Sequence, residues 1–156
     1  MSEEGRYVAD GRNAPGGEGE LTVANSRIDF DGAATMGADL PGPADLLAGA
    51  LAACILKNVE RFSGMLPFEY AGATVHVELT REEQPPRIAR ARYVLTLETD
   101  EPPHRVDLLQ RNIERFGTIT NTLAASCELS GEVITVPAQA DRRELRWASS
   151  VRGSTR

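Results

Sequence analysis

One stretch of the sequence limits the possible folds more than any other: PADLLAGALAACILKNVERF, which runs from residue 43 to residue 62. Its larger apolar side chains recur at the spacing of an α-helix: Leu47, Leu51, Cys54, Ile55, Val59 and Phe62. Between Leu46 and Leu56 no residue is charged, so about three helical turns are apolar on all sides. One amphipathic face would be enough for a small domain. The surplus apolar face predicts that the helix also packs against a partner chain.

The segment before this helix is rich in glycine, alanine and proline and is predicted to be a loop, at residues 31–43. Pro41 and Pro43 fix the start of the helix, because a proline is pre-organised for the first helical position. Asp45 then places a carboxylate in the first turn. There it can accept hydrogen bonds from backbone N–H groups that have no partner within the helix.

The N-terminal part of the chain is polar and glycine-rich. A hairpin turn is predicted at residues 13–19, in NAPGGEG, and short strands are predicted on either side, at 7–12 and 20–30. After the long helix, residues 73–80 and 91–99 alternate apolar and polar side chains. This alternation is typical of half-buried antiparallel strands, and the proline-containing segment 81–90 is interpreted as the hairpin loop between them.

The C-terminal part predicts two helices and a final strand. Residues 102–117 have helical apolar spacing and end at Gly117, and 118–127 open a short second helix. The strand follows at 131–136. Strands, a long buried helix, two long strands, a helix and a strand together predict an α+β domain.

The overall composition excludes several classes of function. A net charge of −6 argues against nucleic-acid binding, which needs a basic surface. No segment reaches the roughly 18 apolar residues of a membrane span, and the N-terminus lacks the pattern of a signal peptide, so we expect a cytoplasmic protein. One domain is expected over 1–137, followed by an arginine-rich tail over 138–156.

Cys54 has two interpretations. A free cysteine is most often a small, inert, buried residue. Alternatively, Ala50 and Ala53 leave space beside the sulfur, and the thiol is reactive. A reactive thiol must ionise, which nearby cations favour. Lys57 is a weak candidate, since the side chain of Cys54 leans toward the N-terminus of the helix and away from it.

Two segments resemble the signatures of the OsmC/Ohr family of osmotically inducible and organic-hydroperoxide-resistance proteins. PGPADLLAGALAAC at 41–54 is similar to the family's cysteine helix. FGTITNTLAASCELSGEV at 116–133 is similar to the family's Cys-Pro-x-Ser-Asn-Thr-Leu motif. The resemblance implies the OsmC-like fold, with antiparallel sheets around a long central helix and an intertwined homodimer. It also implies thiol-dependent reduction of organic hydroperoxides, in defence against oxidative stress, by a cysteine that an arginine and a glutamate activate.

Carried onto this sequence, the resemblance makes Cys54 the attacking cysteine. The family's second, resolving cysteine precedes the Asn-Thr-Leu motif by four residues, where this chain has Gly117. Cys127 follows the motif and is interpreted as a core or boundary residue. We therefore expect no disulfide between Cys54 and Cys127.

The activating pair is also altered. The family's glutamate lies ten residues before the cysteine, where this chain has Ala44, and the neighbouring Asp45 is the candidate carboxylate. Arg27 is the candidate arginine. Its planar group of donors suits a thiolate better than the ammonium group of a lysine does.

These observations leave two functional hypotheses. The first is an enzyme in which Cys54 reduces an organic hydroperoxide and an external thiol reduces the enzyme again, without a metal or other cofactor. The second is a non-catalytic homodimeric module that binds a small apolar molecule at the dimer interface. In either case Met36, Leu40 and Ala50 are the predicted apolar contacts of the ligand. His76 and His104 lack partners at metal-ligand spacing and are interpreted as structural or solvated residues.

Overall fold

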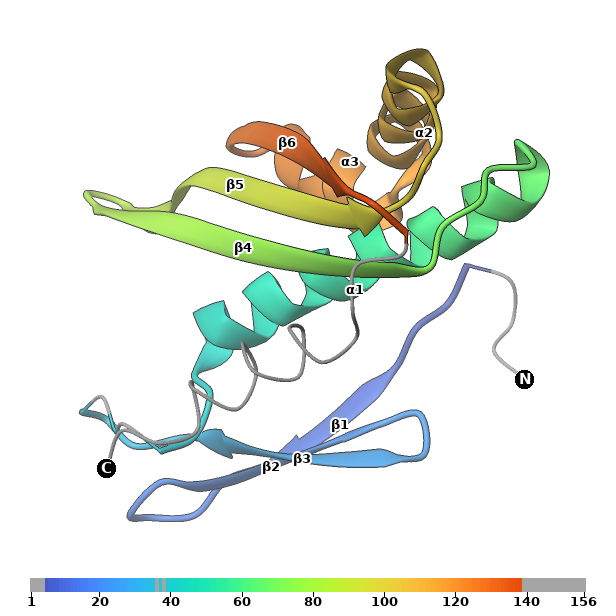
Figure 1. The fold of residues 1–156 in the computed structure, drawn as a ribbon. Coiled ribbons are helices and arrows are strands. Elements are labelled where there is room, and N and C mark those ends of the chain that lie inside the picture. The colour runs from blue at the N-terminus through green and yellow to red at the C-terminus, as the bar shows by residue number, and fades with distance from the viewer. Residues whose placement is uncertain (1–4, 36, 38, 139–156) are drawn as a thin grey trace. The chain divides into compact units, whose positions relative to one another are not determined.

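A computed structural model describes residues 5–35, 37 and 39–138 of the chain. The chain divides into two compact units, Met1–Gly49 and Ala50–Arg156. Each unit is described in turn, with the elements labelled as in Figure 1. The expected boundary after residue 137 stays a prediction, since residues 139–156 lie outside the described part.

The first unit contains a three-stranded antiparallel sheet. Its strands are β1 (Ala9–Arg12), β2 (Glu18–Val23) and β3 (Ser26–Asp31), in the order β1-β2-β3. The predicted turn at 13–19 is confirmed. The segment 20–30, predicted as one strand, is two strands, because the chain reverses at Ala24 and Asn25. Ala24 has a φ of 53°, in the left-handed region, without the glycine that usually signals such a turn.

The second unit contains a mixed sheet of three strands, β4 (Gly72–Glu83), β5 (Pro86–Glu98) and β6 (Glu128–Val136). β4 and β5 are antiparallel, as predicted. Their connection is much shorter than the predicted loop at 81–90, because both strands continue to a turn at Gln84 and Pro85, which are joined by a cis peptide bond.

β6 pairs with β5 in parallel, so the expectation of antiparallel sheets holds for the first sheet and for β4 and β5 only. A parallel neighbour needs a connection that returns the chain to the same end of the sheet. The helices α2 (Pro103–Phe116) and α3 (Thr118–Ala124) form this connection. Both helices and the predicted stop of the first one at Gly117 are confirmed.

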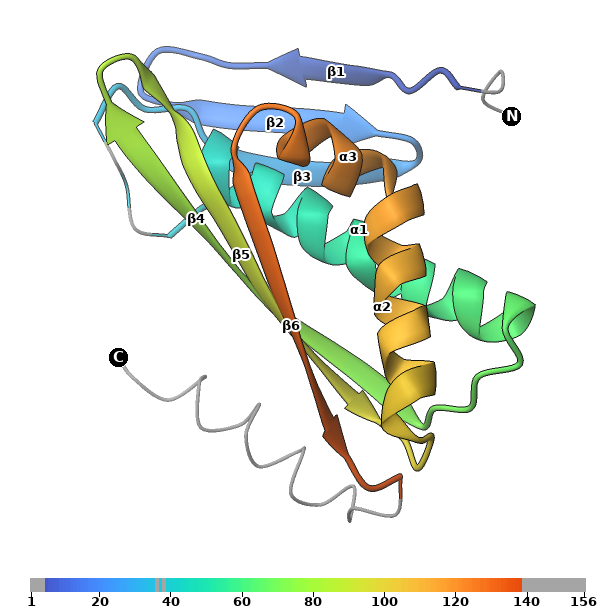
Figure 2. The same ribbon diagram turned by 90° about the horizontal axis from the view of Figure 1, so that it is seen from above.

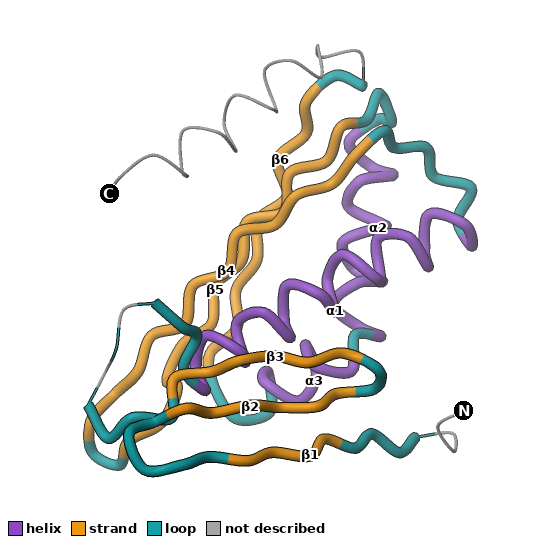
Figure 3. Tube along the Cα trace, turned by 90° about the horizontal axis from the view of Figure 1, so that it is seen from below, coloured by secondary structure: helices purple, strands orange, loops and turns teal. Residues whose placement is uncertain are grey.

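The helix α1 spans Pro43–Met65, as its apolar spacing predicts. It begins in the first unit and continues through the second. From Ala50 onward it lies on the same face of the second sheet as α2 and α3 (Figures 2 and 3). The core between these layers includes these apolar residues, which are at most 7% exposed: Leu51, Ile55, Val59, Phe62, Ala91, Tyr93, Leu95, Leu97, Val106, Leu109, Ile113 and Leu123.

Tyr93 is the largest fully buried side chain of the core. Its ring lies so close to Gly131 that a side chain at that position would overlap it. The hydroxyl group donates a hydrogen bond of 2.7 Å to Glu114 Oε1, which also accepts one of 3.0 Å from Gln110 Nε2. Burial, and secondarily the Glu114 carboxylate, raise the pKa of the Tyr93 phenol well above its usual range.

This shift predicts a loss of stability at alkaline pH. The unfolded tyrosine ionises near pH 10, whereas the folded one keeps its proton, so the free energy of unfolding falls as pH rises above about 10. The Tyr93 phenol alone lowers the free energy of unfolding by at most about 1.4 kcal/mol for each pH unit above that point. In urea unfolding between pH 8 and pH 11, Tyr93→Phe is expected to show a shallower decline than the wild type. Equal declines in the two proteins would contradict the assignment.

Candidate functional site

Cys54 is half-buried in the middle of α1, in the second unit. Two side chains meet its sulfur. Asn58 Nδ2, one turn further along the helix, lies 3.6 Å from Cys54 Sγ and donates a second hydrogen bond of 2.9 Å to the Cys54 carbonyl oxygen. Thr120 Oγ1, from α3, lies 3.9 Å from the sulfur. The thiol is therefore half-buried, and two polar side chains reach its sulfur.

The helix around Cys54 is lined by small residues, as the sequence suggests. Ala50 lies one turn before Cys54 on the same side of the helix and is partly exposed. Gly49 and Ala53 are exposed, and so is Lys57. Small side chains on an exposed face allow another chain or a ligand to approach the helix backbone closely.

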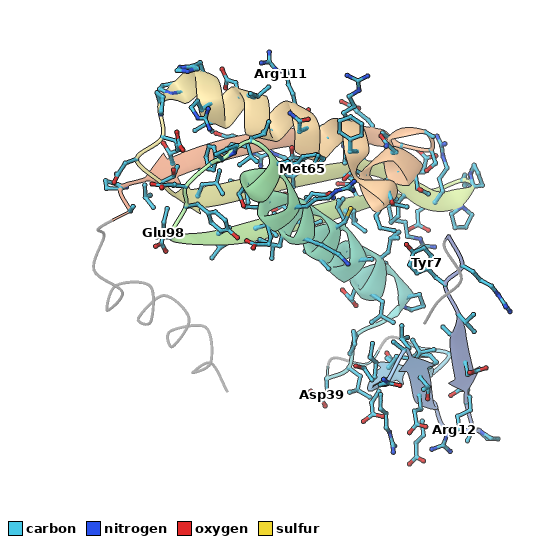
Figure 4. All side chains as sticks on the ribbon, turned by 90° about the vertical axis from the view of Figure 1, so that its right-hand side faces the viewer. Tyr7, Arg12, Asp39, Met65, Glu98 and Arg111 are labelled. Carbon is cyan, nitrogen blue, oxygen red and sulfur yellow. The ribbon has the colours of Figure 1, made fainter. Side chains whose placement is uncertain are left out.

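Arg27 lies in the first unit, on β3. It forms an ion pair with Glu20 on the neighbouring strand, and its Nε lies 3.5 Å from Asp29 Oδ1. Arg12 on β1, which Figure 4 labels, binds the same Glu20 carboxylate through Nε at 3.0 Å. The hydrogen bond from Arg12, with smaller contributions from the charges of both arginines, lowers the pKa of Glu20.

Leu40 lines the same pocket of about 310 Å³ as Arg12, Glu20 and Arg27. The structure therefore brings together two of the residues predicted for the site, Arg27 and Leu40. Arg12 and Glu20 were missed. The predicted turn at 13–19 was the signal that could have found them, since it places residue 12 opposite residue 20 across the hairpin.

Asp45 is engaged at the start of α1. Its Oδ2 accepts a hydrogen bond of 2.9 Å from the backbone N–H of Gly42, so Asp45 satisfies a backbone donor at the N-terminal start of α1. This geometry agrees with the helix-start role that the sequence suggests for it. Met36, the remaining predicted contact, lies outside the described residues.

Gly117, where the family has its second cysteine, connects α2 to α3 in a crowded position. A Cβ atom placed there would lie 2.6 Å from Thr120 Oγ1 and 3.0 Å from the carbonyl oxygen of Ile113. Its φ of −73° is open to any residue, so the requirement for glycine comes from packing and not from backbone conformation. The hydroxyl group of Thr120, which also contacts the Cys54 sulfur, is one of the groups that leave no room for a side chain at position 117.

Cys127 follows α3 and is half-buried. Its thiol donates a hydrogen bond of 3.2 Å to the carbonyl oxygen of Leu123. With Glu114, Thr120 and Glu128, it lines a pocket of about 420 Å³.

Within residues 5–35, 37 and 39–138, no three His, Cys, Asp or Glu side chains gather as metal ligands would. His76 and His104 are both exposed. None of the helices in this described part is long and apolar enough to cross a membrane.

The crowding at Gly117 predicts the effect of a single methyl group. We expect Gly117→Ala to lower the free energy of unfolding by about 1–3 kcal/mol, because the added Cβ forces Thr120 or the backbone of α2 to move. Gly64→Ala is the matched control: Gly64 lies in α1, and a Cβ there meets no atom within 4 Å. That variant should keep or gain up to about 1 kcal/mol, as alanine favours helices. Equal effects of the two substitutions in urea unfolding would refute the packing argument.

Comparisons with known proteins bear on the fold and the family of the chain. The family model described as OsmC-like protein matches residues 36–131. An OsmC-like protein from Mycoplasma pneumoniae superposes with a TM-score of 0.76 at 13% identity, over 88% of this chain and 100% of that one. The organic hydroperoxide resistance protein OhrB of Bacillus subtilis gives a TM-score of 0.63 at 19% identity, over 83% and 98%.

A third structure, an organic hydroperoxide resistance protein from Elizabethkingia anophelis, gives a TM-score of 0.70 at 12% identity, over 86% of this chain and 100% of that one. No curated protein sequence matches this chain significantly.

The mixed α+β fold and its central helix with a half-buried cysteine define the class: an OsmC-like fold. Because the family model matches more than half of the sequence, the chain belongs to the OsmC family.

Proposed function

We propose that this protein reduces organic hydroperoxides through Cys54 and is regenerated by an external thiol. One observation carries the proposal: the half-buried Cys54 thiol, on the cysteine helix of the OsmC family, has two hydrogen-bonding side chains at its sulfur. Relatives of the same fold are named for organic hydroperoxide resistance, which favours this substrate class.

The proposed reaction has two stages. The Cys54 thiolate attacks one peroxide oxygen, an S–O bond forms as the O–O bond breaks, and the departing alkoxide takes a proton to give the alcohol. Cys54 is then a sulfenic acid. A first external thiol displaces water and forms a mixed disulfide, and a second releases Cys54 as the thiol and leaves as part of the oxidised disulfide. Such reductants are kept reduced in the cytoplasm, where we place the protein.

The external reductant follows from what occupies the family's second cysteine position. Gly117 offers no thiol, and its surroundings leave no room for a side chain. Cys127 lies later in the chain, with its thiol bonded to Leu123. We propose that neither residue closes an internal disulfide with Cys54.

We also propose roles for the other residues predicted from the sequence. Arg27 is proposed as a cation for the thiolate, and Met36, Leu40 and Ala50 as apolar contacts for the organic group of the peroxide. The pocket that Arg27 shares with Leu40 supports the association of a cation with an apolar contact. Asp45 has its carboxylate engaged at Gly42, so it supports the start of α1 and has no assigned step.

Peroxide consumption tests the proposal. With dithiothreitol as reductant, the wild type and Cys127→Ser should consume cumene hydroperoxide at similar rates. Cys54→Ser should fall to the uncatalysed rate, because the nucleophile is lost. Mass spectrometry after mild peroxide treatment should show oxidation of Cys54 without a Cys54–Cys127 bond.

The same samples distinguish the alternative, a non-catalytic binding module. Such a module would consume no peroxide in any variant, although iodoacetamide would still alkylate Cys54 in the folded protein. Alkylation only after denaturation would mean that Cys54 is an inert core residue, and both hypotheses would fail.

We also propose a homodimer that buries the uncharged part of α1. Gly49 and Ala53 lie one turn apart on an exposed side of this segment, where a second chain can approach closely. At micromolar concentration, sedimentation equilibrium should give twice the mass of one chain. Ala53→Glu should shift the protein toward the monomer, because it places a charge in the interface.

Arg111→Glu, on α2 and labelled in Figure 4, is the control for that experiment, since it makes a charge change on another exposed helix. It should leave the dimer intact. A wild type that stays folded and monomeric at micromolar concentration would exclude the dimer.

A further inference from the structure

The sulfur of Cys54 is held by two side chains that are themselves almost completely buried. Asn58 is 7% exposed and Thr120 is 1% exposed. They come from different helices, α1 and α3, and reach the sulfur at 3.6 Å and 3.9 Å. Both can donate a hydrogen bond, through an amide N–H and a hydroxyl group.

Neither side chain is explained by packing alone. A buried asparagine in the middle of a helix is unfavourable, because its amide group loses water and competes with the backbone. The bond to the Cys54 carbonyl oxygen uses one N–H of Asn58, and the amide group has a second N–H that can serve the sulfur. Thr120 places a hydroxyl group at the sulfur, where a valine of the same shape would fit an apolar core better.

We propose that Asn58 and Thr120 are the hydrogen-bond donors that stabilise the thiolate of Cys54 and hold its sulfur in position. The inference rests on the proposed function, in which this thiolate is the nucleophile. A thiolate is a stronger acceptor than a thiol, so both contacts strengthen when the proton leaves. Hydrogen bonds to the charged form of a group favour that form.

Charged groups around the thiol do not supply this effect within the second unit. Among its described residues, no ion pair or charged hydrogen bond with the Cys54 sulfur is recorded. On α1, Lys57 and Glu60 are exposed, and the side chain of Cys54 leans away from Lys57. Glu114 of α2, which lines a pocket together with Thr120 of α3, accepts hydrogen bonds from Tyr93 and Gln110 and brings no cation to the thiol.

Substitutions of matched shape separate this role from a purely structural one. Asn58→Leu and Thr120→Val remove the donors while keeping the branching and the number of non-hydrogen atoms of each side chain. Asn58→Asp keeps the shape but replaces the amide N–H groups with a negative charge. Thr120→Ser retains the hydroxyl group. Thr122→Val is the control on the same helix, because the Thr122 hydroxyl is exposed and bonds to the Thr118 carbonyl oxygen.

The measurement is the pH dependence of Cys54 alkylation by iodoacetamide in folded protein, with Cys127→Ser as the background so that one thiol reacts. Asn58→Leu and Thr120→Val should each raise the midpoint by about one pH unit, which is roughly a tenfold smaller thiolate fraction below the midpoint. Asn58→Asp should raise it further. Thr120→Ser and Thr122→Val should match the background protein.

Unchanged midpoints in Asn58→Leu and Thr120→Val would overturn the inference. If Asn58→Leu does not fold, the comparison of Thr120→Val with Thr120→Ser decides alone. Peroxide consumption by the same proteins keeps the two proposals apart. If Cys54 consumes peroxide but the midpoints are unchanged, the proposed function stands and the role of Asn58 and Thr120 as donors is refuted. If the midpoints shift but no peroxide is consumed, the role of the donors stands and the peroxidase function is refuted.

Discussion

Burial of α1 is the constraint on which the rest of the second unit depends. Leu51, Ile55 and Val59 are completely buried, and removing three such side chains from water contributes several kcal/mol. Their spacing fixes the rotation of the helix about its axis. Cys54 precedes Ile55 by one residue, which turns it about 100° away from the buried line, to the margin of the core. The packing that stabilises the helix therefore also presents the thiol.

The glycine at position 117 and the position of Thr120 are parts of one arrangement. Gly117 allows α3 to follow α2 so closely that a Cβ atom would lie 2.6 Å from the Thr120 hydroxyl oxygen. This close approach holds Thr120, which is 1% exposed, against the Cys54 sulfur. A side chain at 117 would force Thr120 or the backbone near Ile113 to move. The glycine at the position of the family's second cysteine is therefore also the residue that lets Thr120 lie against the Cys54 sulfur.

Much of the fold could be predicted from the sequence, because helical and strand periodicities are local. The uncharged run after Leu46 predicted α1, and the alternation of apolar and polar side chains predicted β4 and β5. The parallel pairing of β6 depends on contacts far apart in the chain, which no local pattern records. The turn at Ala24 lacks the usual glycine. At the site, Cys54 was found from a motif, whereas Thr120 lies 66 residues away and Asn58 was passed over, although its position one turn after Cys54 was visible.

In the first unit, ion pairs hold Arg27 in place and still leave its side chain open to another anion. Arg12 and Arg27 share Glu20, and Arg27 also meets Asp29, so two positive charges face two negative ones. The Arg27 side chain is 67% exposed. Such ion pairs contribute little to stability, because water competes for both partners. Exchanging one carboxylate partner for another anion therefore costs Arg27 little. Since Arg12 still binds Glu20 after such an exchange, that carboxylate would not be left without a partner.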